Sequence, residues 1–531
     1  MQTKVKKLIE NILEKEIVLE KPKDISLGHF ATPVAFSLAK ELRKSPMQIA
    51  QDLALKFQDN DIFEEVSAVK GFLNFKLSNK FLEENINKAF ELDYDFAKNI
   101  DDTKKESILL EFVSANPTGP LHIGHARGAI FGDALLRVGK YLGYDIVSEY
   151  YVNDAGAQMG LLATSLYLAA KEYILKEEVE YPEQFYRGDY LIDIANKCIE
   201  KYGKDIFNDE SKKDELAQFA KDEVMKIIIS DLKDLGVEFD NFVSEKSLYS
   251  SWEDTKKVLE DNGSLYTKDG KVWIKSTELG DDVDRVVVRD NGIPTYLAGD
   301  IIYHKNKYDR NFDRYINIWG ADHHGYITRV KSAIKFLGNN PDTLEVILSQ
   351  MVALLQNGKP YKMSKRAGNV ILMSEITEQI GADALRFIFL TKKSDTHLEF
   401  DIELLKNNDS SNPVFYINYA HARINQLFKK ADLSLDDVKD VNIDNINQDA
   451  KDLIFQSLLL GTILDEAFTK RDMQKVTDYL HSLSAMVHKF YNEHKIVGIE
   501  DEKAYLKALA MAALSIRVGL KVLGINAKEV M

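Results

Sequence analysis

Two short clusters of polar residues, far apart in the chain, have side chains that suit phosphate chemistry. His122 and His125 are three residues apart in His-Ile-Gly-His, so a helix would place both rings on one face. A helix N-terminus favours anions, and two imidazoles beside it can donate to phosphate oxygens. Lys362 and Lys365 follow about 240 residues later, as Lys-Met-Ser-Lys within a polar stretch at 356–369. Lysines on a surface loop can close over a triphosphate and offset charge that grows in the transition state.

Each cluster could also be purely structural, as a packed histidine pair or a solvated loop. The elements around the histidines favour the functional interpretation. Residues 108–113 predict a buried strand, 116–120 a turn, 121–142 a helix and 145–151 a second strand. This order predicts a parallel sheet with a right-handed crossover and places the histidines at the start of its helix. The sequence has no Walker A segment and no Gly-x-Gly-x-x-Gly, so ordinary P-loop and dinucleotide sites have no support.

The whole chain predicts three domains, at residues 1–105, 106–400 and 401–531. The first is an α+β unit with helices at 1–16, 32–57 and 79–92 and paired strands at 65–77. The second holds the parallel sheet, helical insertions from about 154 to 236, hairpins at 263–276 and 285–296, and a helix at 382–390. The third has helical periodicity and no proline after Pro413, which predicts an all-α bundle.

The composition narrows the class of protein. The net charge of −15 does not exclude RNA, because nucleic-acid binding depends on local basic surface rather than on net charge. No apolar run is long enough to span a membrane, and the single cysteine, Cys198, excludes an intrachain disulfide and argues against a cysteine-rich zinc site. Asp322, His323 and His324 resemble metal ligands but have no third partner at a suitable spacing. We expect a cytoplasmic protein with no membrane contact and no zinc.

The two clusters together resemble the HIGH and KMSKS signatures of class I aminoacyl-tRNA synthetases. The resemblance extends to the arginyl-tRNA synthetase family over essentially the whole chain, in motifs at 111–125, 151–156, 235–240, 294–300, 320–325, 383–386 and 412–423. Many arginyl enzymes lack the last lysine of the second signature, whereas this sequence keeps Lys365. The resemblance implies an α/β fold: a Rossmann-like parallel-sheet catalytic core with helical insertions, an N-terminal α+β domain that contacts tRNA and a C-terminal helical anticodon-binding domain.

The activity implied by this resemblance is ATP-dependent attachment of L-arginine to tRNA(Arg) through arginyl-adenylate, with release of AMP and pyrophosphate. Mg²⁺ would accompany ATP, held largely by phosphates and water, and the protein would be a monomer. By similarity, His122, His125, Lys362 and Lys365 are catalytic. The implied ATP-binding residues also include Thr118, Gly119, Gly124, Asp322, Met363 and Ser364. Arginine would be bound by Glu111, Asn116, Tyr296 and Asp300, and tRNA by Tyr416, Tyr419, His421 and Arg423.

Several residues of these sets also fit purely structural roles. A guanidinium needs carboxylates, which Glu111 and Asp300 supply; taken alone, Glu111 is equally an ion-paired carboxylate at a strand end, and Asp300 a solvated acid on a helix. Tyr416 and Tyr419, three residues apart, suit base stacking or a helical core. Three other functions are open: a class I synthetase for another amino acid, a small-molecule adenylyltransferase and a non-catalytic RNA-binding paralogue.

Overall fold

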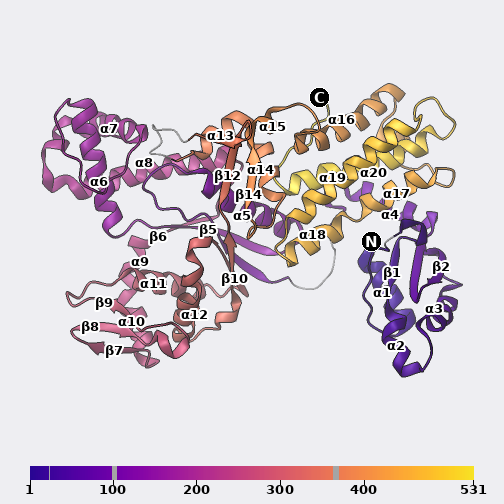
Figure 1. The fold of residues 1–531 in the computed structure, drawn as a ribbon, viewed down its shortest axis with the longest axis horizontal. Helices are drawn as coiled ribbons and strands as arrows, with labels where there is room; N and C mark the ends of the chain where they lie inside the picture. Colours follow the sequence, from indigo (N-terminus) through magenta and orange to yellow (C-terminus); the bar gives the residue numbers. More distant parts are fainter. Residues whose placement is uncertain (23, 99–104, 363–369) are drawn as a thin grey trace. The chain divides into compact units, whose positions relative to one another are not determined.

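The computed structural model describes residues 1–22, 24–98, 105–362 and 370–531, and its packing divides into two compact units. One unit is Asp102–Asn412; the other combines Met1–Asp101 with Pro413–Met531 (Figure 1). The predicted division into three domains stays a prediction. In the part of the chain that the structure describes, every helix is too short or too polar to span a bilayer.

A parallel sheet with the strand order β11-β10-β4-β5-β6 is the centre of unit 102–412. Its strands are β4 (Ser107–Glu111), β5 (Asp145–Val152), β6 (Asn241–Ser244), β10 (Arg314–Gly320) and β11 (Leu344–Ser349). The helices of this unit are α5 (Ile123–Tyr141), α6 (Ala157–Ala169), α7 (Asp189–Tyr202), α8 (Lys213–Asp234), α9 (Glu245–Leu248), α10 (Trp252–Asp261), α11 (Tyr296–Tyr308), α12 (Ile327–Phe336), α13 (Met373–Ile380), α14 (Ala382–Leu390) and α15 (Ile402–Lys406). The predicted α/β class and the βαβ unit β4-α5-β5 are confirmed.

Helices cover both faces of this sheet, which is why β4 is apolar on both sides. Helix α5 packs on one face, against β4, β5 and β10. A cluster that joins Leu109 and Tyr315 to Tyr308 of α11 and Ile334 of α12 covers the other. From β4 the chain proceeds outward through β5 and β6, and it returns to the other side of β4 with β10 and β11. This reversal creates a crevice outside the carboxyl ends of β4 and β10, where ligands bind in folds of this type.

Two smaller sheets complete the unit. One has the order β13-β12-β14, from β12 (Val352–Gln356), β13 (Lys359–Pro360) and β14 (Leu398–Asp401). The other has the order β7-β8-β9, from β7 (Leu265–Lys268), β8 (Lys271–Ile274) and β9 (Arg285–Val288). The first predicted hairpin is confirmed by the pairing of β7 with β8. The second, at 285–296, is present with a short return arm: the chain turns at 289–292, the Arg289 N–H donates to the Ile293 carbonyl at 3.0 Å, the Thr295 N–H donates to the Val287 carbonyl at 2.9 Å, and Val288 bridges Pro294. Its first arm, β9, also pairs with β8, and α11 begins at Tyr296. Proline lacks the N–H that a continued ladder would need.

The second unit joins the two ends of the chain. Its antiparallel sheet β1-β3-β2 is formed by β1 (Phe30–Thr32), β2 (Phe63–Val69) and β3 (Phe72–Leu77). Its helices are α1 (Gln2–Leu13), α2 (Val34–Leu42), α3 (Pro46–Ala54), α4 (Asn79–Leu92), α16 (Pro413–Ala431), α17 (Gln448–Leu458), α18 (Leu460–Thr469), α19 (Gln474–Glu493) and α20 (Glu502–Val522). Helices α17 and α20 pack on α4, and the His29 and Phe30 rings lie 4.4 and 5.3 Å from the ring of Phe455 on α17. Burial lowers the pKa of His29 to about 4, so the ring is neutral in this contact.

Candidate active site

A pocket of about 870 Å³ opens at the carboxyl edge of the parallel sheet. Four strands contribute to its lining, each through its carboxyl end and the loop after it: Glu111 and Val113 to Asn116 at β4, Tyr151 and Asn153 at β5, Ile318 to His323 at β10, and Ser349 to Met351 at β11. The helices α5 and α11 add His122, Gly124, His125, Gly128, Asp300, Tyr303 and His304. The crevice expected at the reversal of strand order is therefore a pocket, and it brings together the first histidine cluster and the predicted acidic residues.

The loop after β4 has an unusual backbone. Val113 and Ser114 adopt positive φ values of 67° and 41°, a backbone conformation that residues other than glycine rarely take. Hydrogen bonds hold it: the Ser114 hydroxyl donates to Glu111 Oε1 at 3.0 Å and accepts from the Tyr151 N–H at 3.1 Å. The loop places Asn116 in the pocket lining. Strain of this kind is often found at ligand sites.

The two histidines at the start of α5 are neutral donors in a fixed tautomer. Nδ1 of His122 accepts from the Gly124 N–H at 3.1 Å, and Nδ1 of His125 accepts from the His122 N–H at 3.3 Å. Each ring therefore carries its hydrogen on Nε2. The rings stack with centroids 3.7 Å apart, and burial lowers both pKa values, that of His125 to about 3. Two neutral N–H groups result, beside the amide groups of a helix N-terminus.

The second signature meets this helix start through its C-terminal flank. The Ile123 N–H donates to the Ile371 carbonyl, and the Met373 N–H donates to the Leu121 carbonyl, both at 2.9 Å. Lys362 is exposed, while Met363, Ser364 and Lys365 lie outside the described residues. Thr118 and Gly119 are not part of the described pocket lining, and the hydroxyl of Tyr190 donates to the Thr118 carbonyl at 2.7 Å. The ATP roles predicted for these residues stay predictions.

The acidic end of the pocket differs from the prediction in one respect. Glu111 lines the pocket, but its carboxylate forms a buried ion pair with Lys307, which is 0% exposed and also donates to Asn317 Oδ1 at 2.8 Å. The structural role considered for Glu111, an ion-paired carboxylate at a strand end, therefore holds in this structure. Its negative charge is compensated by a lysine that the sequence reasoning did not single out. Its role in arginine binding stays a prediction.

Asp300 can present its carboxylate to a ligand in the pocket. Its carboxylate lines the pocket and accepts a hydrogen bond from the Tyr326 hydroxyl. Burial, together with the nearby charges of Glu245 and Glu111, raises the pKa of Asp300 to about 7. It is therefore not a solvated helix acid. Tyr296, one turn earlier on α11, is 50% exposed and absent from the lining; its hydroxyl accepts from the Ala157 N–H at 3.2 Å. Its predicted contact with arginine stays a prediction.

Glu245, on the short helix α9, does not line the pocket, but it is a buried carboxylate beside it that the sequence reasoning missed. It is 2% exposed, its Oε1 accepts from the Tyr249 hydroxyl at 2.9 Å, and its Oε2 has no hydrogen-bond partner among the described residues. Burial raises its pKa, and its charge raises the pKa of Asp300 and Tyr151, both of which line the pocket. An unpartnered buried carboxylate oxygen is costly without a cation. The spacing of Glu245 and Tyr249, four residues apart after a strand, was the available signal.

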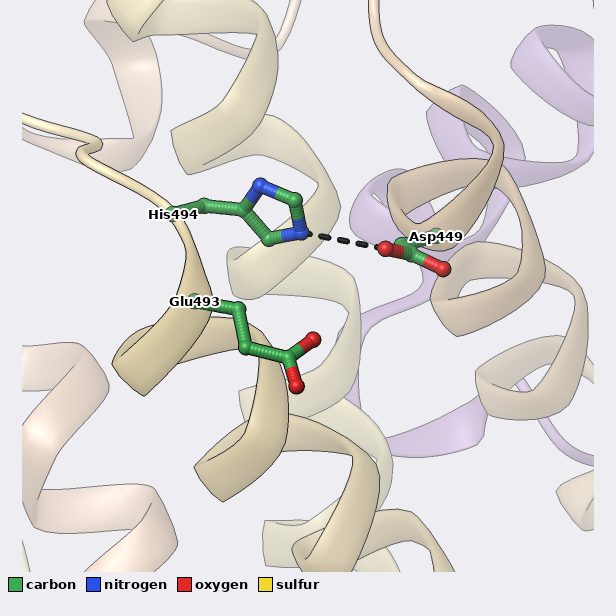
Figure 2. A group of neighbouring side chains, drawn as sticks. All are labelled: Asp449, Glu493 and His494. Carbon is green, nitrogen blue, oxygen red and sulfur yellow. Dashed lines mark hydrogen bonds and ion pairs between the residues drawn. The ribbon is translucent and has the colours of Figure 1, made fainter.

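The remaining polar candidates are partly explained by local contacts. Asp322 lines the pocket and is exposed, with Nε2 of His323 3.7 Å from its carboxylate. In the C-terminal bundle, Asp449, Glu493 and His494 form a further group of possible metal ligands (Figure 2). However, Nε2 of His494 lies 3.1 Å from Asp449 Oδ2, and its Nδ1 is 3.3 Å from the Asn447 amide. Both ring nitrogens are thus used in linking the start of α17 to the end of α19.

The four tRNA candidates on α16 lie in different environments. Tyr419 is 37% exposed, and the Arg423 guanidinium lies over its ring at 4.9 Å and over Tyr491 at 4.0 Å. Tyr416 is half-buried, with its ring 4.5 Å from that of His488. His421 is 4% exposed and its Nδ1 lies 2.9 Å from the Lys528 carbonyl, so its surroundings are those of a packing residue. Nucleotide contacts by these residues stay predictions.

Comparisons with known proteins agree with this geometry. Residues 90–428 match the family of class I tRNA synthetases (R), catalytic domain, residues 1–77 match the arginyl tRNA synthetase N terminal domain, and residues 417–531 match the DALR anticodon binding domain. The chain is 69% identical to arginine–tRNA ligase of Aliarcobacter butzleri, with 100% of both chains covered, and 58% identical to that of Nitratiruptor sp. over 100% of each. The Thermus thermophilus arginyl-tRNA synthetase structure shares the fold, with a TM-score of 0.77 at 19% identity over 100% of both chains. The chain therefore belongs to the arginyl-tRNA synthetase family of class I enzymes.

Proposed function

We propose that this chain attaches L-arginine to tRNA(Arg) with ATP, through arginyl-adenylate. The observation that carries the proposal is the pocket at the sheet edge, which holds two neutral imidazole donors at one end and the Asp300 carboxylate at the other, with the charge of Glu245 close by. The arginine carboxylate attacks the α-phosphorus and pyrophosphate leaves; a hydroxyl at the 3′ end of the tRNA then attacks the carbonyl carbon and AMP leaves. Neither step needs a covalent bond to the enzyme, so catalysis consists of positioning and charge stabilisation.

The histidine end suits ATP. Nε2–H of His122 and of His125 donate to phosphate oxygens, Gly124 leaves room for the adenine ring, and Asp322 accepts from the ribose. The carboxylates Asp300 and Glu111 lie at the other end of this pocket, next to β5 and α11. With these two carboxylates away from the histidine end, an Mg²⁺ ion would be bound there by the ATP phosphates and water, and it would reduce the negative charge of the phosphates.

The acidic end suits the guanidinium group. Asp300, which lines the pocket, and Glu245, buried close to it, supply two negative charges to a planar cation with five N–H donors. The stacked rings of Tyr151 and Tyr303, with centroids 4.2 Å apart, form an apolar wall for the side-chain methylenes. Asn116, in the loop after β4, binds the backbone end of the amino acid.

An exchange assay separates the possible functions. Pyrophosphate exchange into ATP is measured with each amino acid in turn, with and without total tRNA. We expect exchange with arginine alone and dependence on tRNA. Exchange with another amino acid would indicate a different class I synthetase. No exchange with any amino acid would indicate an adenylyltransferase with a different acceptor or a non-catalytic paralogue, and pyrophosphate release from ATP with other acceptors distinguishes these two.

The affinity for arginine should depend on pH through Asp300. Its pKa is raised to about 7, so at lower pH the carboxyl carries a proton that must leave before a guanidinium binds. We expect the Kd for L-arginine to rise as pH falls below about 7, up to about tenfold per pH unit. Equilibrium titrations from pH 5.5 to 8.5 test this, with Asp300→Asn as the control that loses the inflection. The histidines do not interfere, because burial lowers the pKa values of His122 and His125. A flat profile would contradict the assignment.

We also propose that unit 1–101 with 413–531 binds the tRNA outside its acceptor end. The exposed Tyr419 and the half-buried Arg423 offer a stacking surface and a cation. A groove of about 520 Å³ between α1, α4 and α17 offers a second contact. Lys4, Lys7, Lys88 and Lys98 line this groove, its floor includes Leu8 and Phe96, and no carboxylate is among its described lining residues. A cytoplasmic location and a monomeric state stay predictions.

Removal of two groove lysines should weaken tRNA binding, because fewer positive charges would then contact the phosphates of the tRNA. The double variant Lys7→Ala/Lys88→Ala loses two phosphate contacts, so the slope of log Kd against log salt should fall by about 1.4 to 1.8. The matched control is Lys6→Ala/Lys80→Ala on the same helices, where Lys6 lies 3.5 Å from Glu10 and Lys80 lies 3.4 Å from Asp61. Filter binding of tRNA(Arg) at several salt concentrations measures both. Equal slopes for the two double variants would exclude the groove.

A further inference from the structure

The helix that carries Glu245 is too short to hold its own orientation. Helix α9 spans only Glu245–Leu248, which leaves its backbone groups dependent on neighbours. Asp154, two residues after the end of β5, supplies the contacts. Its Oδ1 accepts from the Lys246 N–H at 3.0 Å and from the Ser244 hydroxyl at 2.9 Å, and the same hydroxyl is 2.8 Å from Oδ2. The side chain of Asp154 thus ties the first turn of α9 to the sheet.

Asp154 acts at a distance from the pocket. It is 6% exposed and is not among the residues that line the pocket, whereas its neighbour Asn153 is. The closest cation is Lys221, whose Nζ lies 3.7 Å from Oδ2. A buried carboxylate that accepts a backbone N–H and a hydroxyl fixes geometry more strongly than a neutral acceptor would.

On its other side, Glu245 packs against the backbone of α11 at Gly299, where there is no Cβ. A Cβ added at Gly299 of α11 would lie 2.6 Å from Oε1 of Glu245 and 3.0 Å from the Tyr249 hydroxyl. Glycine at this position therefore lets the carboxylate approach the backbone of α11 directly beside Asp300. Two features from different elements, Asp154 and Gly299, confine Glu245 from two sides.

We infer that Asp154 is a positioning residue for arginine recognition: it holds α9 so that the free oxygen of Glu245 stays beside Asp300. The inference rests on the proposed binding of the guanidinium by Glu245 and Asp300. It assigns no contact with substrate to Asp154, whose effect passes through one turn of helix. Gly299 also determines the position of Glu245, because the absence of a Cβ there leaves the space that the Glu245 carboxylate fills.

Three variants and one combination test the inference on the full chain. Asp154→Ala should raise the Kd for L-arginine about 10- to 100-fold, the scale of losing a charge-assisted hydrogen bond, with the Kd for ATP within about twofold of wild type. Asp154→Asn keeps an oxygen for Lys246 N–H and Ser244 and should recover part of this loss. Gly299→Ala should also weaken arginine binding, because its Cβ would displace the Glu245 carboxylate.

The decisive measurement is a double-mutant cycle with Glu245→Gln. If Asp154 acts through Glu245, Asp154→Ala causes little further loss of arginine affinity in the Glu245→Gln background. An undiminished loss in that background, or an equal weakening of ATP binding, would overturn the inference. Thermal melts confirm that each variant is folded. A chain that exchanges pyrophosphate with arginine but shows additive effects retains the proposed function and loses only this inference; a wild-type chain without such exchange loses the function itself.

Discussion

Asp300→Asn should weaken L-arginine binding about 100-fold or more while the Kd for ATP changes less than about twofold. The substitution removes the charge of the carboxylate that lines the proposed guanidinium end of the pocket, and truncating one partner of a buried charge pair costs about 2–5 kcal/mol. The remaining carboxylate, Glu245, still attracts the ligand but cannot replace the second half of a forked contact. Equilibrium titrations with L-arginine and with ATP measure both affinities.

A crossed control sharpens this result. Asp322→Asn changes an exposed carboxylate of the same pocket, at the loop after β10. It should weaken ATP binding and leave L-arginine binding within about twofold of wild type, the reverse of the Asp300 pattern. Equal losses for both ligands in the Asp300 variant would show that the pocket had collapsed rather than lost a charge.

His125→Ala should lower the rate of arginine activation about 10²- to 10³-fold. Its Nε2–H is a neutral donor fixed by the hydrogen bond from the His122 N–H to Nδ1, and losing one preorganised donor in a transition state has effects of this size. The Kd for L-arginine should change little, because the acidic end of the pocket is untouched. Single-turnover formation of arginyl-adenylate in the presence of tRNA measures the step.

The control for this variant is His324→Ala, an exposed histidine next to the pocket that is not part of its lining. Its activation rate should stay within about twofold of wild type. The rate should also not fall between pH 8 and pH 6 through the histidine pair, since burial lowers the pKa of His125 to about 3 and keeps the ring neutral. A His125→Ala enzyme with the wild-type rate would remove this ring from the mechanism.

Elements whose structure depends on residues close together in the chain were predictable from the sequence. The β4-α5-β5 unit follows from one apolar run, one turn and one helical stripe, and α4 and α14 have the bounds predicted for them, 79–92 and 382–390. Within the site, His122 and His125 were found because a helix start brings residues three apart together without help from the rest of the fold.

Features that depend on distant packing were not predictable. In the sequence, nothing distinguishes Lys307 from an exposed lysine on a helix. It is buried against Glu111 because α11 packs close to β4. Glu245 sits in a segment of ordinary polarity, and its importance follows from an oxygen that no described residue satisfies. The pairing of β9 with β8 was not predictable, because a turn signal at Asn291-Gly292 says nothing about which strand lies on the other side of β9.

The contact of His29 and Phe30 with Phe455 has a consequence for biosynthesis. The first of these residues leave the ribosome more than 400 positions before the last, which at about 5–20 residues per second is roughly 20 to 80 s. During that interval the apolar face of the N-terminal module has no cover, while the whole of unit 102–412 is made and can fold. Folding of unit 1–101 with 413–531 is therefore completed last, when the C-terminal helices have been synthesised and can pack on the N-terminal residues.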